Sequence, residues 1–194
     1  MLNTFFKFGE FIFQKNFAIY KPLYEVYKAL SDRHERDCMK AILKKGDCVI
    51  DIGANIGSYT RFFSDIVAEE GLVIAFEPDA INFSRLKDVK FKYGNVQIQN
   101  CAVGDKDENV KLYLSSEYNV DHRSYQPKEE KQRSFAEVKM VTLDNFLEHS
   151  NRKINFIKMD IQGFEYFALK GMHNVLISNN DIKMILEYCP YALK

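Results

Sequence analysis

The chain has 194 residues and equal numbers of basic and acidic side chains, 27 of each. This length suits one domain with a proper core and at most a small appendage. The balanced charge gives no reason to expect binding to nucleic acid or to an anionic membrane. Cys38, Cys48, Cys101 and Cys189 form no Cys-x-x-Cys pair and have no histidine at zinc-ligand spacing, which favours reduced thiols in the cytoplasm. No apolar run is long enough to span a bilayer.

Residues 1–46 predict a helical N-terminal extension. Ala18 to Leu30 has apolar residues at helical spacing, interrupted by Pro22, and a second short helix is expected from Arg36 to Leu43. The start, Leu2 to Phe17, is rich in phenylalanine. Contact with a membrane surface is one interpretation of this segment. Because few basic residues accompany the rings, packing on the domain or on a second subunit, as in a homodimer, is favoured.

Residues 47–194 predict a single α/β domain. Continuous apolar runs at Val49–Ile52, Leu72–Phe76 and Val96–Val103 alternate with helical patterns, one of which covers Ala80 to Tyr93. Uninterrupted apolar strands separated by helices are typical of a doubly wound, mostly parallel, Rossmann-like sheet with helices on both faces.

The pattern changes in the second half of the domain. Val110–Leu114 and Glu137–Val141 alternate between apolar and polar residues, which predicts an inserted antiparallel hairpin. The polar stretch between them, Ser115 to Ser134, is interpreted as a lid over a binding site. Further elements are expected in the order helical turn, strand, helix and strand, at Asp144–Glu148, Asn155–Met159, Phe164–Ile177 and Ile182–Leu186.

An acidic residue stands at the end of each of four predicted strands: Asp51, Glu77, Asp160 and Glu187. A single acid in this position often caps a helix or accepts turn N–H groups. Four in register are better explained by a polar cleft, because ligands of open α/β sheets bind outside the carboxyl ends of the strands.

The glycine turn after the first strand narrows the choice of ligand. A dinucleotide site wants three glycines in the pattern G-x-G-x-x-G, whereas this turn has only Gly53 and Gly57. Asp51 would repel a pyrophosphate and would suit a cationic ligand. S-adenosylmethionine carries a sulfonium and an ammonium group, and Glu77 can accept hydrogen bonds from its ribose. The methyl donor is therefore favoured, and an NAD(P)-dependent oxidoreductase is the less favoured alternative.

Several motifs resemble, in the right order, those of the FkbM family of S-adenosylmethionine-dependent methyltransferases, and together they cover roughly residues 46 to 190. The matching segments are Asp51–Gly57, Phe76–Pro78, Asn100–Asp105, Asp121–Arg123, Thr142–Asp144, Ile157–Glu165 and Leu169–Met172.

The resemblance implies a class I methyltransferase fold that acts on hydroxyls of sugars or other small molecules. It implies that the methionine part, the ribose and the adenine of the cofactor contact Asp51, Gly53, Ala54, Asn55, Gly57, Tyr59, Thr60, Glu77, Pro78, Cys101, Ala102 and Asp160. The fold usually continues with a helix and an antiparallel strand pair after its fifth strand, and this sequence stops at Lys194. A cofactor-binding or interaction module without activity is therefore the second hypothesis.

Methyl transfer to a hydroxyl needs alignment of the two reactants and a base for the proton. Asp160 is the first candidate base, with a turn cap as its alternative role, and His122 in the predicted lid is the second. Arg123 and Tyr125 are candidates to bind the acceptor. Glu165 is either an acceptor contact or a structural carboxylate at a helix start. No metal site is predicted.

Overall fold

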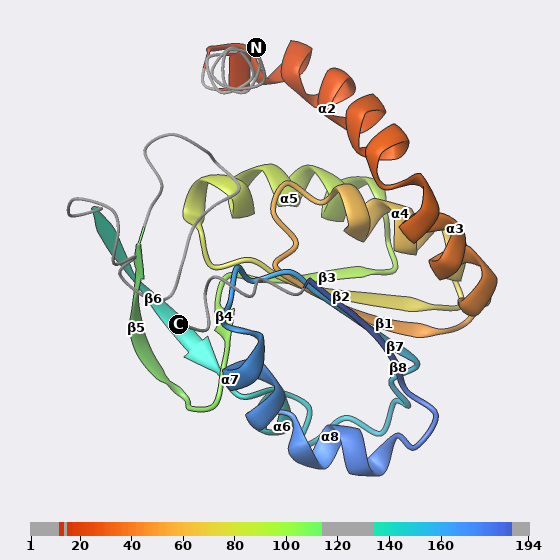
Figure 1. Cartoon of the computed structure of the whole chain (residues 1–194), viewed down its shortest axis with the longest axis vertical. Helices are drawn as coiled ribbons and strands as arrows, with labels where there is room; N and C mark the ends of the chain where they lie inside the picture. The colour runs from red at the N-terminus through yellow and green to blue at the C-terminus, as the bar shows by residue number, and fades with distance from the viewer. Residues whose placement is uncertain (1–11, 14, 114–133, 188–194) are drawn as a thin grey trace.

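The computed structural model of the chain describes residues 12, 13, 15–113 and 134–187 (Figure 1). Its centre is a parallel sheet in the order β3-β2-β1-β7-β8, so the strand order reverses between β1 and β7. The strands are β1 (Cys48–Ile52), β2 (Leu72–Phe76), β3 (Val96–Gln99), β7 (Phe156–Met159) and β8 (Lys183–Leu186). This topology confirms the predicted doubly wound α/β fold.

Helices cover both faces of this sheet (Figure 1). One face carries α4 (Ser58–Val67) and α5 (Ala80–Lys92), and the other carries α6 (Leu143–Phe146), α7 (Glu165–Lys170) and α8 (His173–Ser178). Both faces of β1 are therefore buried, with Ile50 and Ile52 in one apolar cluster and Val49 in the other. This two-sided burial explains why the strand is an unbroken apolar run apart from Asp51.

The predicted strand Val96–Val103 was wrong in one respect, because the chain leaves the central sheet after Gln99. The Asn100 amide donates hydrogen bonds to the carbonyl oxygens of Glu77 (2.9 Å) and Pro78 (3.1 Å) at this point. The chain then forms a second sheet in the order β4-β6-β5. Its strands are β4 (Ala102–Val103), β5 (Glu108–Tyr113) and β6 (Phe135–Val141), and the antiparallel pairing of β5 with β6 confirms the predicted hairpin.

The helix predicted from Phe164 to Ile177 is also corrected, since α7 and α8 are separate helices that meet at Gly171. A side chain at Gly171 would overlap the carbonyl oxygen of Gly104, so the break lets the two segments pack closely. The Asp144 carboxylate accepts the N–H groups of Asn174 (3.1 Å) and Val175 (2.9 Å) and holds the start of α8.

The N-terminal extension forms α2 (Phe17–Ser31) and α3 (Arg33–Ile42) within the described residues. Polar contacts hold α2 on the domain, among them a 2.6 Å ion pair between Arg61 and Glu25. The opposite side of α2 exposes apolar residues at helical spacing, here called the apolar stripe: Ile19, Leu23, Val26 and Leu30. Such a face suits the homodimer expected from the sequence, and both this dimer and the membrane contact stay predictions. Residues 1–11 of the phenylalanine-rich start lie outside the described part of the chain. None of the helices in the described ranges is long and apolar enough to cross a membrane.

Candidate active site

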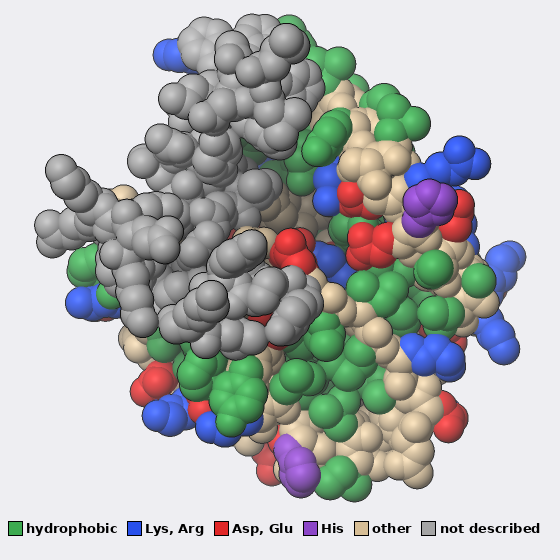
Figure 2. Space-filling model, in the orientation of Figure 1, with side chains coloured by type: hydrophobic (Ala, Val, Ile, Leu, Met, Phe, Trp, Pro, Cys, Tyr) green, Lys and Arg blue, Asp and Glu red, His purple; other side chains and the backbone are tan. Residues whose placement is uncertain are grey.

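A cavity of about 330 Å³ lies at the carboxyl ends of β1, β2 and β7, beside the point where the strand order reverses. Its size is at the lower end of the roughly 300–1,000 Å³ of small-ligand sites. Charged side chains face a hollow below the N-terminal helices in Figure 2. The cavity therefore lies where a doubly wound sheet places its ligand.

The glycine turn after β1 forms the floor of the cavity. Gly53 has φ +79°, and a side chain there would overlap the carbonyl oxygen of Asp160, so the turn lies directly against the end of β7. Gly53, Ala54 and Asn55 all line the cavity, as predicted for cofactor contacts. Gly57 does not line it. Gly57 (φ +88°) faces α5, where a side chain would crowd Leu86 and Val89, so this glycine serves the packing of α5.

Glu77 closes one end of the cavity and is 5% exposed. Its carboxylate accepts the N–H groups of Asn55 (2.7 Å) and Asp79 (2.9 Å), and each oxygen keeps a lone pair for a ligand. Burial raises the pKa of Glu77 to about 7, although the two N–H donors oppose this shift. The predicted contacts Pro78, Cys101 and Ala102 line the same cavity, together with Asn82. Asn82 was not predicted from the sequence, where its only signal is its position in the first turn of the helix after the Glu-Pro motif.

Asp51 is completely buried beneath the cavity and does not line it. One of its oxygens accepts the hydroxyl of Thr60 at 2.6 Å, and the other lies 3.9 Å from the ammonium of Lys158. Burial raises the pKa of Asp51, and Lys158 and Thr60 oppose that rise. The cation beside this carboxylate in the described structure is therefore a side chain of the protein itself. Thr60, predicted as a cofactor contact, supports Asp51 from below.

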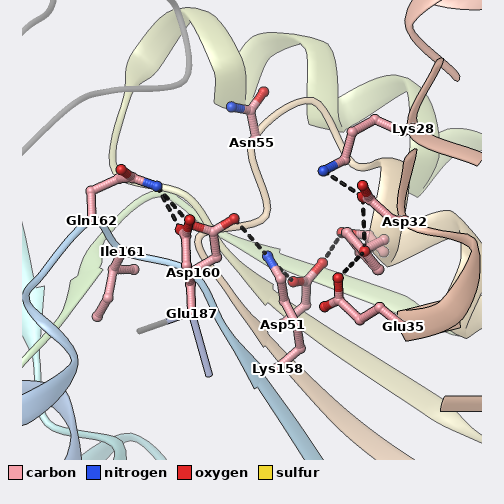
Figure 3. Close-up of polar contacts among 12 residues, drawn as sticks. Lys28, Asp32, Glu35, Asp51, Asn55, Lys158, Asp160, Ile161, Gln162 and Glu187 are labelled. Carbon is pink, nitrogen blue, oxygen red and sulfur yellow. Dashed lines mark hydrogen bonds and ion pairs between the residues drawn. The ribbon is translucent and has the colours of Figure 1, made fainter. Parts of the chain in front are cut away.

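Lys158 is a residue of this site that was not predicted from the sequence. Its ammonium lies between Asp51 and Asp160, 3.6 Å from the latter, and 5.0 Å from the centre of the Tyr59 ring (Figure 3). Burial disfavours the charge of Lys158, but the two carboxylates outweigh burial and raise its pKa. The sequence signal that could have identified Lys158 is its position inside the apolar strand 156–159. A buried charge is stable there only with charged or hydrogen-bonding partners, so the lysine indicates a nearby carboxylate.

Asp160 and Glu187 line the cavity at the ends of neighbouring strands. The side-chain amide of Gln162 donates to both carboxyl groups, at 2.9 Å from Asp160 and 2.7 Å from Glu187 (Figure 3). The carboxyl and ammonium groups that line the described cavity are thus those of Glu77, Asp160 and Glu187, and of Lys28 and Lys158. Both lysines are paired with carboxylates, so the protein itself neutralises the two cations of the cavity.

The N-terminal extension contributes a wall of the same cavity through Tyr24, Tyr27 and Lys28 of α2. The predicted contact Tyr59 also lines it, with its hydroxyl 2.9 Å from Asp32 and 3.0 Å from Glu35. These contacts fasten the α2–α3 junction to α4. The sequence did not predict that α2 lines the cavity. Helical periodicity shows which face of a helix is apolar, but it does not show which part of the domain that helix packs against.

Of the remaining predicted residues, His122, Arg123 and Tyr125 lie outside the described residues. Glu165 does not line the cavity. Its carboxylate accepts the N–H groups of Ile161 (3.2 Å) and Gly163 (3.1 Å), which is the structural alternative considered for it. Within the described ranges, no group of three or more His, Cys, Asp or Glu side chains is placed to hold a metal ion.

The fold and the cavity define a Rossmann-like α/β protein with a small-ligand-sized cavity at the switch point of its sheet. Residues 51–192 match the family described as Methyltransferase FkbM domain. The chain therefore belongs to the FkbM methyltransferase family, as its motifs predicted.

Among curated proteins, the chain is similar to the hexuronic acid methyltransferase AglP of Haloferax volcanii, with 27% identity over 171 residues. The match covers 81% of this chain and 64% of that relative's length. Solved structures with a similar fold include an rRNA methylase from Streptococcus thermophilus (TM-score 0.45, 10% identity, 79% of this chain and 68% of that one). Another is the fibrillarin of Aeropyrum pernix with natively bound S-adenosylmethionine (TM-score 0.44, 12% identity, 79% and 52%).

Proposed function

We propose that this chain transfers a methyl group from S-adenosylmethionine to a hydroxyl of a small molecule, with a sugar as the favoured acceptor class. The observation that carries the proposal is that one cavity contains both parts of such a site. Glu77 can accept hydrogen bonds from ribose hydroxyls, and the acids Asp160 and Glu187 line the same cavity with the glycine turn. The similarity to a hexuronic acid methyltransferase supports a sugar acceptor.

The residues present fit this cofactor. The ribose hydroxyls can donate to the free lone pairs of Glu77, and Cys101 and Ala102 offer an apolar surface next to it for the adenine. Gly53 lets the turn lie directly against the end of β7, so that its backbone lines the cavity beside Asp160, where the methionine part would pass. The carboxyl oxygens of Asp160 and Glu187 can accept hydrogen bonds from the ammonium group of the cofactor.

In the proposed reaction the cofactor supplies an electrophilic methyl group. The protein aligns the acceptor hydroxyl with that methyl group, shields both from water and removes the proton of the hydroxyl. Asp160 sits at the end of β7, fixed by its N–H donating to the carbonyl of Ile52 at 3.0 Å, and is the proposed base. Tyr24 and Tyr27 on α2 narrow the entrance and exclude water from the reacting atoms. His122 as a second base, and Arg123 and Tyr125 as acceptor contacts, are further parts of this proposal, whereas Glu165 keeps the structural role described above.

Isothermal titration calorimetry with S-adenosylhomocysteine tests the cofactor. We expect binding by the wild-type chain, binding weakened at least tenfold in Glu77→Ala, and unchanged binding in the exposed control Glu148→Ala. Absence of heat with folded wild-type protein at millimolar ligand contradicts the proposal. Binding of NADH in its place favours an oxidoreductase.

The acceptor test uses S-adenosylmethionine with a radiolabelled methyl group and a panel of sugar glycosides, including p-nitrophenyl glucuronide. Labelled product that survives mild alkali is a methyl ether, and product that mild alkali destroys is a methyl ester. Tight cofactor binding without transfer to any glycoside supports the alternative hypothesis of an inactive binding module.

A further inference from the structure

The side chains of Asp160 and Glu187, which the sequence predicts at one edge of the sheet, form a pair in the structure. β7 and β8 are parallel neighbours in which Met159 is opposite Leu186, so the residues that follow them emerge side by side. The backbone fixes both, because Asp160 N–H donates to Ile52 and Glu187 N–H donates to Met159 at 2.9 Å. The Gln162 amide nitrogen lies 2.9 Å from one carboxyl group and 2.7 Å from the other, and two carboxyl groups held this close favour a single shared proton over two negative charges.

The surroundings of this pair are arranged to hold its charge. Gln162 adopts a left-handed backbone conformation (φ +54°), and its amide reaches both carboxyl groups. The remaining oxygen of Asp160 lies 3.6 Å from the ammonium of Lys158. A bridging amide and a buried ammonium are more than a turn cap requires, since a cap needs only backbone N–H groups.

We propose that Asp160 and Glu187 act together as a proton-sharing general base toward the acceptor hydroxyl. The inference rests on the proposed methyl transfer and adds Glu187 as a catalytic residue. The acceptor oxygen forms a bond to the methyl carbon as the bond between methyl and sulfur breaks. The electron pair of the broken bond stays on sulfur, and the proton of the acceptor hydroxyl passes to the carboxyl pair.

A shared proton makes the pair a better base than Asp160 alone. Burial disfavours the Asp160 charge, but Lys158 and the hydrogen bonds from Glu187 and Gln162 hold its pKa below the ordinary value, so Asp160 in the singly protonated pair is a weak base. The hydrogen bond to Asp160, with burial, raises the pKa of Glu187 to about 8. The doubly ionised pair therefore takes up a proton near neutral pH, where general bases are most effective.

Groups on several elements face the pair and set this equilibrium. Lys158 and Lys28 favour its charge, whereas the neighbouring carboxylates disfavour a second charge. The facing titratable groups in the described structure are Lys158 on β7, Glu165 on α7, Tyr24 and Lys28 on α2, and Asp51 on β1.

The pair also selects the chemical class of acceptor. An alcohol needs a base and gains from the negative pair, whereas a carboxylate needs no base and would be repelled by it. We therefore expect methyl ethers and not methyl esters, even when the acceptor is a hexuronic acid.

The first test observes the carboxyl groups directly and needs no substrate. NMR of the full chain with ¹³C-labelled Asp and Glu side chains is expected to show Glu187 titrating near pH 8. Asp160→Asn removes the shared proton and is expected to lower this pKa toward about 4.3. The control is Asp181→Asn, which removes a surface carboxylate paired with Lys153 and is expected to leave the pKa of Glu187 unchanged. If Asp160→Asn does not fold, Gln162→Ala replaces it as the test. Loss of the side-chain amide removes the N–H donors to both carboxyl groups, so the pKa of Glu187 is expected to rise further.

The second test is the pH dependence of transfer to whichever glycoside the wild-type chain methylates. The rate is expected to rise with pH through the pKa measured by NMR, and Glu187→Gln is expected to flatten this rise and lower turnover about 100-fold. Independent titration of both carboxyls below pH 5, or full activity of Glu187→Gln, overturns the shared base while leaving the methyltransferase proposal intact. Failure of the wild-type chain to bind S-adenosylhomocysteine defeats the proposed function instead.

Discussion

The contact between the glycine turn and the end of β7 predicts a large cost for one methyl group at Gly53. Gly53→Ala places a side chain against the carbonyl of Asp160 and near Ile161 (3.2 Å), in a backbone conformation with φ +79°. A left-handed conformation costs an alanine about 1–2 kcal/mol, and overpacking costs about 1–3 kcal/mol more. We expect the free energy of unfolding to fall by about 2–5 kcal/mol, or roughly 2–4 °C in Tm for each kcal/mol in a chain of this size.

Two other glycines separate the two contributions. Gly46 has a similar φ (+85°), but no atom lies within 4 Å of the place that a Cβ would take, so Gly46→Ala measures the conformational cost alone. Gly94 has neither constraint, and Gly94→Ala is expected to be neutral or to stabilise by about 0.4–1 kcal/mol. Urea unfolding of the three variants measures the series, and S-adenosylhomocysteine affinity should fall only in Gly53→Ala. If Gly53→Ala unfolds no more easily than Gly46→Ala, the close approach of turn and strand is refuted.

Three further predictions follow from burial and exposure. Cys38 is exposed and should react quickly with a thiol reagent, whereas burial raises the pKa of Cys48 to about 11 and should protect it until unfolding, as mass spectrometry of labelled peptides can show. Lys158→Met leaves two carboxylates without their cation, so we expect a loss of about 3–5 kcal/mol at pH 7 that shrinks in acid as Asp51 is protonated, and urea unfolding at wild-type denaturant concentrations would contradict this. Leu23→Glu in the apolar stripe should abolish self-association in sedimentation velocity, and a wild-type chain that is already monomeric at micromolar concentration refutes the dimer.

Much of the fold was predictable because parallel strands buried on both faces leave a direct signature. The apolar runs at β2 and β7 are each followed by an acid, the run at β1 contains one at Asp51, and parallel pairing alone brings the carboxyl ends of these strands to one edge. The cavity position therefore followed from the sequence, with Gly53 and Glu77 in it. This part of the site depends on local patterns and on one topological rule.

The rest depended on contacts between segments distant in the sequence. Asn100 turns the chain out of the sheet through bonds to Glu77 and Pro78, which its own neighbours do not indicate. Asp51 was expected to face a cationic ligand, and its sequence neighbours did not show that the ammonium of Lys158, more than a hundred residues later, lies 3.9 Å from its carboxylate. Helical periodicity likewise could not show that Tyr24 would line the cavity. Such partners are decided by tertiary packing, for which a single sequence has no code.

Glu77 gives a prediction that joins stability to the proposed cofactor. Because its pKa rises from 4.5 to about 7 on folding, the folded chain holds a proton between these values that the unfolded chain has lost. Stability should therefore fall as pH rises through this window, by about 3 kcal/mol in total, and change no further above pH 7 for this group. Glu77→Gln cannot titrate. The side-chain amide introduced by Glu77→Gln would face a backbone N–H group and so lowers stability by an amount that does not vary with pH. The pH dependence of the difference in free energy of unfolding between the wild-type chain and Glu77→Gln therefore reports the titration of Glu77 alone.

The same proton should leave when the ribose binds, because hydroxyl donors favour the ionised carboxylate. Calorimetry of S-adenosylhomocysteine binding in buffers of different ionisation enthalpy should detect proton release near pH 6 that disappears above pH 8. Comparison with Glu77→Gln removes any contribution of Asp160 and Glu187, whose protons respond in both proteins. Equal proton release by the wild-type chain and Glu77→Gln would mean that the ribose does not bind Glu77, and the orientation proposed for the cofactor would have to be reversed.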